Sequence, residues 1–257
     1  MRDTLRLSRS SGSIRMTCNQ KGLPVDSSNL VVRALDMLQK KLGIKEGMRV
    51  HLNKKIPMGA GLGGGSSDAA AALLGGWTLW KKKNDIFKKP KRVPPVLQTC
   101  AKMLGADVAF FLKGGTAWAE GVGERLTPMK KKASRWMVLV YPHVHVATPL
   151  AYRLLDKARK KSREENGGDP LSWRARPASF RQLRSKNFFN SFEPVILRSF
   201  PEIKKAKTAL VSLGGEGVMM SGSGSTVFGF ARNKIHARRM VQALNGRKWQ
   251  VFLCQTV

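Results

Sequence analysis

Residues 57–72 join a glycine-rich loop to the start of a helix, and their chemistry suits the binding of phosphate. The sequence there is Pro-Met-Gly-Ala-Gly-Leu-Gly-Gly-Gly-Ser-Ser-Asp-Ala-Ala-Ala-Ala. Glycines accept positive φ and let a ligand approach the backbone closely, and free N–H groups at a helix N-terminus attract an anion. The segment therefore predicts a nucleotide loop. It lacks the Gly-Lys-Ser/Thr ending of a Walker A motif and the spacing of a Rossmann fingerprint, so it is a nucleotide loop of another kind.

Three polar residues follow the glycines and predict the start of the helix. Ser66, Ser67 and Asp68 are residue types that cap helices, and Ala69–Leu74 have high helix propensity. A plain connection between a strand and a helix is the alternative interpretation of the loop. Two or three glycines would serve such a connection, whereas the five between residues 59 and 65 would destabilise it unless the open backbone has a use.

An isolated acid and a second loop of small residues are the other candidates for chemistry. Asp107 lies at an expected helix start, ahead of an apolar run. The residues alone leave it open whether Asp107 is an N-cap or a partly buried carboxylate that accepts a proton from an attacking hydroxyl beside phosphate. Ser221–Ser225 permits close backbone approach, and a flexible hairpin turn explains it equally well. Neither serine loop fits a nucleophile elbow, which argues against a hydrolase.

Positive charge is the unusual feature of the composition. The chain has 47 Lys and Arg against 16 Asp and Glu, a net charge of +31. Such a field attracts polyanions, so a nucleic-acid-binding protein is the rival hypothesis. The basic runs fall between apolar segments, as solvated loops do, and no aromatic stacking platform, zinc finger or RNP motif accompanies them. We expect at most weak, salt-sensitive, non-specific RNA binding.

Cysteine and histidine usage indicates neither a disulfide framework nor a metal centre. The three cysteines are far apart, and His143 and His145 alternate beside an apolar run, as on one face of a strand end. We predict no metal ligands and a reducing, cytoplasmic location. No apolar run approaches the roughly 18 residues needed to cross a bilayer, so we expect a soluble protein without a membrane partner.

Apolar periodicity predicts a mixed α+β protein. Alternation predicts a hairpin within residues 5–18 and a strand over 48–52 that leads into the glycine loop. Helical spacing predicts a helix over 30–42, which Ser27, Ser28 or Asn29 can cap and which Gly43 stops. Further along the chain the patterns predict a basic linker at 81–92, a helix at 94–104, irregular strand at 115–126 with bends at Gly121 and Gly123, and a central strand at 136–141. They then predict helices within 177–213, strands at 218–220 and 226–230, a helix at 233–243 and a strand at 249–254.

A polar, charged stretch from about residue 160 to 176 predicts a loop and a domain boundary. A chain of 257 residues is long enough for two modest domains. We expect a first domain over residues 1–160 and a second over 161–257. The second has the element order of an α+β unit of ferredoxin-like pattern.

Three segments of the chain resemble the motifs of the GHMP kinases. They are Lys55–Ala70, Gly105–Val108 with Phe110–Leu112, and Met220–Ser225. The tandem Gly-Leu-Gly-Gly-Gly-Ser-Ser-Asp-Ala-Ala is similar to the branch of this superfamily that acts on a cytidine-diphosphate-linked methylerythritol, whereas mevalonate and homoserine kinases have a shorter loop with a different ending. The similarity includes Gly114–Ala117, Glu120–Glu124 and Thr148–Tyr152, and runs from about Asp3 to the C-terminus.

The resemblance implies a fold and a reaction. The fold is α+β with two domains, an N-terminal ribosomal-protein-S5-like domain that binds ATP and a C-terminal ferredoxin-like domain. The reaction is ATP-dependent phosphorylation of the 2-hydroxyl of the small-molecule substrate, with Mg²⁺ beside the nucleotide, in non-mevalonate isoprenoid precursor synthesis. A non-catalytic polyanion-binding protein on the same fold, and another small-molecule GHMP kinase, are the alternatives.

The resemblance also implies roles for single residues. Asp107 is the catalytic base, which favours this interpretation over the N-cap. Thr148 and Tyr152 lie at the cytosine pocket, and Gly222 and Gly224 contact substrate. ATP lies at the domain interface, between the loops at 57–67 and 221–225. The residues implied to hold the nucleotide are Pro57, Met58, Gly59, Ala60, Gly61, Leu62, Gly63, Gly64, Gly65, Ser66 and Ser67, with Asn29 and Leu30 at a nearby helix start.

The first strand of the family has no counterpart in these residues. Members begin with an Ala-Lys-x-Asn-Leu strand and an Asp-Gly-Tyr-His turn, which supply a lysine beside the aspartate and part of the cytosine site. Here Met1-Arg2 leads directly into Asp3-Thr4-Leu5. Without that lysine the aspartate loses its partner, so we expect this chain to be weakly active or inactive.

Overall fold

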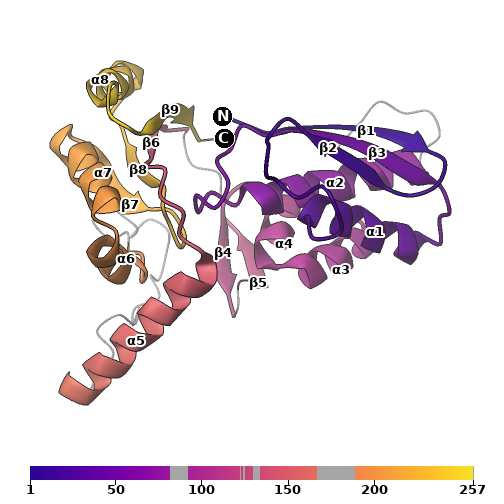
Figure 1. Cartoon of the computed structure of the whole chain (residues 1–257), viewed down its shortest axis with the longest axis horizontal. Coiled ribbons are helices and arrows are strands. Elements are labelled where there is room, and N and C mark those ends of the chain that lie inside the picture. Colours follow the sequence, from indigo (N-terminus) through magenta and orange to yellow (C-terminus); the bar gives the residue numbers. More distant parts are fainter. Residues whose placement is uncertain (82–91, 122, 124, 130–133, 167–188, 257) are drawn as a thin grey trace. The chain divides into compact units, whose positions relative to one another are not determined.

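The computed structural model describes residues 1–81, 92–121, 123, 125–129, 134–166 and 189–256 (Figure 1). Its contacts divide the chain into two compact units. The N-terminal unit comprises residues 2–58 and 63–132, and the C-terminal unit comprises residue 1, residues 59–62 and residues 133–257. The tip of the glycine loop is therefore grouped with the C-terminal unit, while both flanks of the loop belong to the N-terminal unit.

A three-stranded sheet forms one layer of the N-terminal unit. Its strands β1 (Thr4–Ser10), β2 (Arg15–Cys18) and β3 (Gly47–Asn53) are ordered β1-β3-β2, with β1 antiparallel and β2 parallel to β3. The predicted hairpin between β1 and β2 is wrong, because β3 lies between them. Met48, Val50 and Leu52 of β3 are all buried, which favours the central position for this strand. The chain between β2 and β3 includes a helix, the kind of crossover that a parallel pair requires.

Four helices lie on one side of this sheet (Figure 1). They are α1 (Leu30–Leu42), α2 (Gly64–Lys81), α3 (Pro95–Leu104) and α4 (Ala106–Lys113), and they bury a shared apolar core with the sheet. The prediction for α1 is confirmed: Asn29 Oδ1 accepts a hydrogen bond from Val31 N, and Gly43 ends the helix at φ 64°. A hairpin of β4 (Ala117–Glu120) and β5 (Arg125–Pro128) follows α4. Its bends at Gly121 and Gly123 have positive φ, as expected.

A four-stranded antiparallel sheet forms the centre of the C-terminal unit. Strands β6 (Trp136–Tyr141), β7 (Glu216–Met220), β8 (Val227–Phe230) and β9 (Gln250–Gln255) are ordered β7-β8-β6-β9. The helices of this unit are α5 (Thr148–Asn166), α6 (Glu193–Ser199), α7 (Pro201–Ser212) and α8 (Lys234–Leu244). The element order is β6-α5-α6-α7-β7-β8-α8-β9. It keeps the βαββαβ succession of the ferredoxin-like pattern that was expected, with α5, α6 and α7 in the first connection. The predicted central position of β6 is confirmed.

The division of the chain differs from the expected one. The ferredoxin-like pattern needs β6, which pairs with both β8 and β9, so the C-terminal unit begins near residue 133 and not at residue 161. Residues from about 160 were expected to form a loop, and this expectation is wrong as far as Asn166, where α5 ends. Lysine, arginine and glutamate dominate that stretch, and all three are good helix formers. The rest of the predicted loop, residues 167–176, and most of the basic linker lie outside the described residues.

Within the described ranges, no helix is both long enough and apolar enough to cross a membrane.

Candidate active site

The glycine loop, residues 57–67, bends through three left-handed residues before α2 begins. Gly59, Gly61 and Gly63 have φ of 59°, 72° and 65°, a region that favours glycine over every other residue. The first helical bond runs from Ser67 N to Gly63 O at 2.9 Å. The N–H groups of residues 64–66 therefore precede the intrahelical ladder and are available to an anion.

The three polar residues after the glycines do not cap α2. The helix already begins at Gly64, so Ser66, Ser67 and Asp68 lie inside its first turns. Ser67 Oγ donates to Gly64 O at 2.8 Å, and Asp68 pairs with Lys54. Their predicted capping role is wrong because glycine, with no side chain to obstruct close packing, allows the helix to start earlier.

Two glycines of the loop are enclosed by atoms of the C-terminal unit. A Cβ on Gly59 would lie 2.2 Å from His145 Nδ1, and one on Gly61 would lie 2.2 Å from Ser221 O. Both distances are far inside van der Waals contact, so neither position can hold a larger residue without rearrangement. From the sequence, His145 was predicted only to lie at a strand end. The spacing of the residues gave no sign that His145 would contact Gly59.

The second small-residue loop, Ser221–Ser225, holds the tip of the glycine loop. Ser221 Oγ donates to Gly61 O at 2.8 Å, and Thr226 N donates to Ala60 O at 3.1 Å. All four residues belong to the C-terminal unit. The structure thus brings together the tips of two segments that are about 160 residues apart in the chain.

The predicted substrate residues gather at the same loop. The hydroxyls of Thr148 and Ser223 are 3.1 Å apart, with Ser223 between Gly222 and Gly224. Tyr152 lies one turn further along α5, is 54% exposed, and packs edge-to-face on the Phe192 ring with centroids 5.0 Å apart. Four predicted residues from two distant segments therefore form one surface.

Asn190 is a residue of this surface that sequence reasoning missed. Its Nδ2 donates to Met220 O and to Gly222 O, each at 2.8 Å, which fixes the start of the second loop. A single asparagine ahead of a helical pattern gives no signal of such a role. At the end of the second loop, the hydroxyls of Ser225 and Thr226 are buried and have no hydrogen-bond partner within the described structure.

Asp107 lies in the first turn of α4 and is exposed. It makes no capping hydrogen bond, so the N-cap interpretation is not realised, and the expectation of a partly buried carboxylate is wrong. The acid directly precedes the buried residue Val108. Phe111, one turn after Asp107 on the same face of α4, has its ring within 2.8 Å of where a Cβ on Gly63 would be. This face of α4 therefore adjoins the glycine loop.

The start of α1 lies beside the first turn of α2. A Cβ on Gly65 would have Leu30 Cδ1 as its nearest neighbour, at 3.8 Å. Asn29 uses its side chain twice, accepting from Val31 N at 2.9 Å and donating to Pro24 O at 2.6 Å. The expected proximity of this helix start to the glycine loop is therefore present, although the Asn29 amide is occupied by the backbone.

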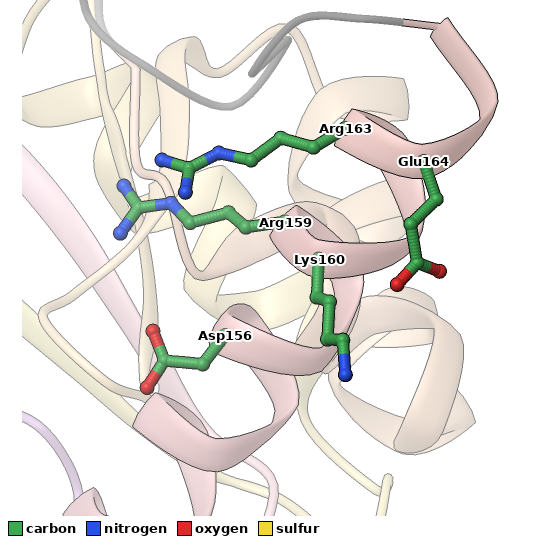
Figure 2. A pocket seen from close by; sticks show the side chains of 5 residues that line it. All are labelled: Asp156, Arg159, Lys160, Arg163 and Glu164. Atoms are coloured by element: carbon green, nitrogen blue, oxygen red, sulfur yellow. The ribbon is translucent and has the colours of Figure 1, made fainter.

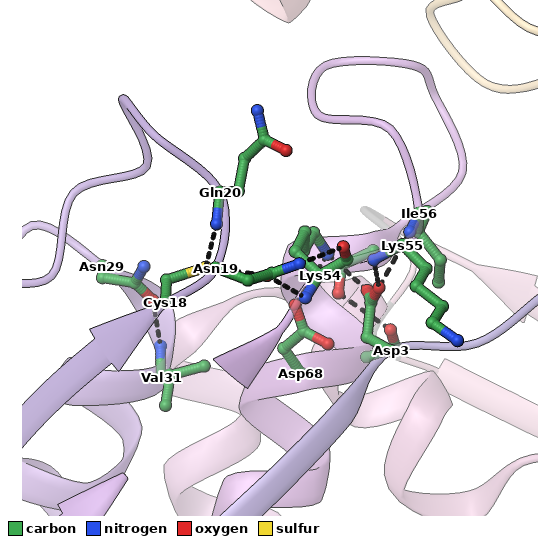
Figure 3. Close-up of polar contacts among 12 residues, drawn as sticks. Asp3, Cys18, Asn19, Gln20, Asn29, Val31, Lys54, Lys55, Ile56 and Asp68 are labelled. Atoms are coloured by element: carbon green, nitrogen blue, oxygen red, sulfur yellow. Dashed lines mark hydrogen bonds and ion pairs between the residues drawn. The ribbon is translucent and has the colours of Figure 1, made fainter. Parts of the chain in front are cut away.

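A buried ionic cluster beneath the glycine loop was not predicted (Figure 3). Lys54 Nζ lies 2.5 Å from Asp3 Oδ2 and 2.7 Å from Asp68 Oδ2. Burial raises the pKa of Asp68 to about 6, against the hydrogen bond and charge of Lys54, which lower it. The pKa of Asp3 is below its ordinary value: burial raises it, but the hydrogen bonds from Lys54 and from the backbone of Ile56 and Lys55 outweigh burial.

Two surface pockets are lined by residues outside the two loops. One of about 340 Å³ is on α5, where Arg159 and Arg163 point the same way from successive turns (Figure 2). Its lining residues are Asp156, Arg159, Lys160, Arg163 and Glu164. The other, of about 640 Å³, is formed mainly by α3, α4 and β5 and includes none of the loop residues.

Comparison with known proteins agrees with this geometry. A model of the GHMP kinases N terminal domain matches residues 29–115, and one of the GHMP kinases C terminal matches residues 174–250. A solved homoserine kinase from Cytophaga hutchinsonii is 22% identical over 99% of this chain and 85% of its own, with a TM-score of 0.68, which speaks for the fold alone. The fold and the glycine loop define a kinase of the GHMP class.

Relatives of higher sequence identity indicate one family within the GHMP kinases. A 4-diphosphocytidyl-2-C-methyl-D-erythritol kinase of Thermus thermophilus is 40% identical over 88% of this chain and 76% of its own length. One of Geobacter sp. is 39% identical over 88% and 75%. A crystal structure of 4-(cytidine 5'-diphospho)-2C-methyl-D-erythritol kinase is 33% identical over 98% of this chain and 85% of its own, with a TM-score of 0.70. The chain belongs to the 4-diphosphocytidyl-2-C-methyl-D-erythritol kinase family.

Proposed function

We propose that this protein transfers the terminal phosphoryl group of ATP to the 2-hydroxyl of 4-diphosphocytidyl-2-C-methyl-D-erythritol. The observation that carries the proposal is the glycine loop, with three left-handed glycines leading into the N-terminus of α2. Such a loop presents backbone N–H groups to a phosphate. The substrate is the one named for the relatives that match most of this chain.

The nucleotide phosphates lie along residues 57–67 in this proposal. The N–H groups of residues 64–66 and the dipole of α2 stabilise negative charge there, and the hydroxyls of Ser66 and Ser67 are half-buried at the same helix start. Asn29 and Leu30 line the neighbouring helix start. Pro57 and Met58 precede the left-handed glycines, so in this proposal they contact only the edge of the nucleotide.

Mg²⁺ fits this site as an ion carried by the phosphates. Among the described residues no group of three or more His, Cys, Asp or Glu could hold a metal. Mg²⁺ keeps several waters and is commonly bound through substrate phosphates with one or two protein oxygens. When bound, it neutralises charge on the phosphate oxygens. Hydroxyl oxygens of Ser66 or Ser67 are the available protein donors on the loop.

Asp107 is proposed as the base that receives the proton of the substrate 2-hydroxyl. A carboxylate accepts a proton as the hydroxyl oxygen attacks phosphorus, which stops positive charge from developing on the nucleophile. Its exposed position in the first turn of α4, on the face that adjoins Gly63, makes it reachable by a substrate.

The surface of Thr148, Tyr152, Gly222 and Gly224 is proposed to bind the cytidine part of the substrate. An exposed tyrosine ring offers a flat face to a base. The Thr148 hydroxyl and the backbone of the second loop offer hydrogen-bonding groups beside it. The T-shaped contact with Phe192, with the two ring planes at 89°, fixes the orientation of the Tyr152 ring.

Release of ADP tests the reaction directly. The purified chain is mixed with ATP, Mg²⁺ and the cytidine-linked alcohol, and phosphorylated product is identified by mass spectrometry. Product at the 2-hydroxyl that disappears with Asp107→Asn supports the proposal, even at the low turnover expected for this chain. ADP release that is the same without the alcohol, or with mevalonate or homoserine in its place, contradicts it.

Weak binding of nucleic acid is a second proposal, and charge favours it. The chain has a net charge of +31, and the exposed Arg153, Lys157 and Lys160 lie on one face of α5. Non-specific binding of this kind depends steeply on salt. RNA that binds at 50 mM salt and is released at 200 mM supports it. An affinity independent of salt contradicts it.

A further inference from the structure

We infer that the buried cluster of Lys54, Asp3 and Asp68 is a positioning device that holds the glycine loop in its nucleotide-binding shape. The inference rests on the proposed binding of ATP at this loop. It assigns these three residues to nucleotide affinity, although none of them is proposed to touch the nucleotide.

The cluster joins the two ends of the loop. Lys54 immediately precedes the segment that enters the loop, and Asp68 lies in α2 just after it, so the ion pair spans 14 residues of chain and closes around the glycines. Asp3 Oδ1 also accepts from Lys55 N at 2.6 Å and from Ile56 N at 2.8 Å. Figure 3 shows Lys54 between the two carboxylates. Entry and exit of the loop are thus tied to one ammonium group.

The ammonium group lies against the residue that begins α2. A Cβ on Gly64 would come within 2.9 Å of Lys54 Nζ and of Ile56 Cγ2. Gly64 has no positive φ, so its conformation alone does not require glycine. The requirement comes from Lys54 and Ile56, whose side chains occupy the space beside the N–H groups that the proposal assigns to phosphate.

Stability alone gives no reason for such a cluster. The three side chains are 5%, 3% and 4% exposed, and charges buried to this degree lose solvation that their mutual attraction often fails to recover. Apolar residues of similar size would serve a merely structural role as well or better. A fixed geometry, in contrast, is what short ionic hydrogen bonds to both ends of a flexible glycine segment provide.

The backbone of Lys54 is fixed independently of its side chain. Asn19 Oδ1 accepts from Lys54 N at 2.7 Å, and Asn19 Nδ2 donates to Lys54 O at 3.3 Å. Substituting the side chain therefore leaves the end of β3 anchored. The variants below change the cluster and keep the strand that carries it.

Calorimetric titration of ATP with Mg²⁺ tests the inference. In Asp68→Asn we expect the Kd of ATP to rise about tenfold or more, while the KM of the cytidine-linked alcohol stays within about twofold. The matched control is Leu97→Ala, a fully buried core residue on α3 of the same unit. It lowers the melting temperature without touching the cluster, and we expect its Kd for ATP to match the wild type.

A charge-free cluster separates positioning from stability. The triple variant Lys54→Met, Asp3→Asn, Asp68→Asn removes every charge together, so we expect it to fold with a melting temperature near the wild type and to bind ATP about tenfold or more weakly. Wild-type affinity in the folded triple variant overturns the inference. If the triple variant does not fold, wild-type affinity in Asp68→Asn overturns it, as does an equal loss in Leu97→Ala. A wild-type chain that binds no ATP defeats the proposed function instead.

Discussion

The hydroxyl of Ser221 donates to the carbonyl oxygen of Gly61 across 2.8 Å, and it joins the tips of two loops that the chain separates by 160 residues. One loop leads into a helix N-terminus and the other carries the residues proposed to meet the substrate. Within the C-terminal unit, this contact and the bond from Thr226 N to Ala60 O hold the tip of the glycine loop against the second small-residue loop. Its geometry depends on the absence of a side chain at Gly61, whose Cβ would collide with Ser221 O.

Replacing Gly61 with alanine is expected to weaken ATP binding about tenfold or more. A left-handed φ costs a non-glycine residue about 1–2 kcal/mol, and crowding against Ser221 adds about 1–3 kcal/mol, whereas 1.4 kcal/mol already equals a tenfold change. Titration calorimetry measures the change. The control is Gly12→Ala, because Gly12 also has positive φ but has no atom within 4 Å of its Cβ position. Equal affinity in wild type and Gly61→Ala would contradict the account.

Removing the Ser221 hydroxyl is expected to have a smaller effect. Ser221→Ala loses one hydrogen bond, worth about 0.5–1.5 kcal/mol, and leaves room for the loop. ATP affinity should therefore fall by less than in Gly61→Ala. If Ser221→Ala were the more damaging variant, the hydrogen bond and not the crowding would govern the contact.

Asp107→Asn is expected to lower kcat about 10²–10⁴-fold, the usual contribution of a general base. Because the side chain is exposed and makes no capping bond, the melting temperature and the Kd of ATP should change little. Asp36→Asn, at an exposed acid on α1, is the control for loss of one negative charge. A kcat that falls equally in both variants would remove Asp107 from the chemistry.

Tyr152→Ala is expected to raise the KM of the cytidine-linked alcohol about tenfold, since stacking of a base on an aromatic ring contributes about 1–3 kcal/mol. Tyr152→Phe keeps the ring and should retain a KM near the wild type. Steady-state kinetics at saturating ATP measures both. A KM that rises as much in Tyr152→Phe as in Tyr152→Ala would show that the hydroxyl, and not the ring, contacts the substrate.

Asp68 makes the stability of the N-terminal unit depend on pH. Its pKa is raised from 3.8 to about 6 in the folded state, so the folded state holds a proton that the unfolded state has released. Stability from this group is present below about pH 4 and is lost as pH rises through about 6. The pKa of Asp3 is lowered, so Asp3 titrates below this window.

Thermal unfolding from pH 4.5 to 8 measures this dependence. The side chain at position 68 of Asp68→Asn cannot ionise. The melting temperature of this variant should therefore rise relative to that of the wild type as the pH increases across the window. Lys40→Met, which removes an exposed partner of Asp36 on α1, should follow the wild-type curve. Parallel curves for wild type and Asp68→Asn would contradict the raised pKa.

Features that depend on near neighbours in the chain were predictable from the sequence. The left-handed glycines before a helix, the Asn29 cap, the Gly43 stop and the bends at Gly121 and Gly123 each follow from a residue type and its immediate neighbours. The ferredoxin-like order of the second unit also followed from strand and helix spacing. Its first strand, β6, and most of α5 were assigned to the other domain, because pairing and packing across the sheet leave no local mark.

The sequence by itself determined the class of the protein, since glycine spacing and helix signals act over a few residues and the motifs are continuous. Tertiary structure decided which strands and side chains contact one another. It placed β3 between β1 and β2, set Lys54 between Asp3 and Asp68, and brought Asn190 to the loop at Gly222. These choices depend on which surfaces become buried together, and burial is a property of the packed chain, in which residues distant in sequence exclude water from one another.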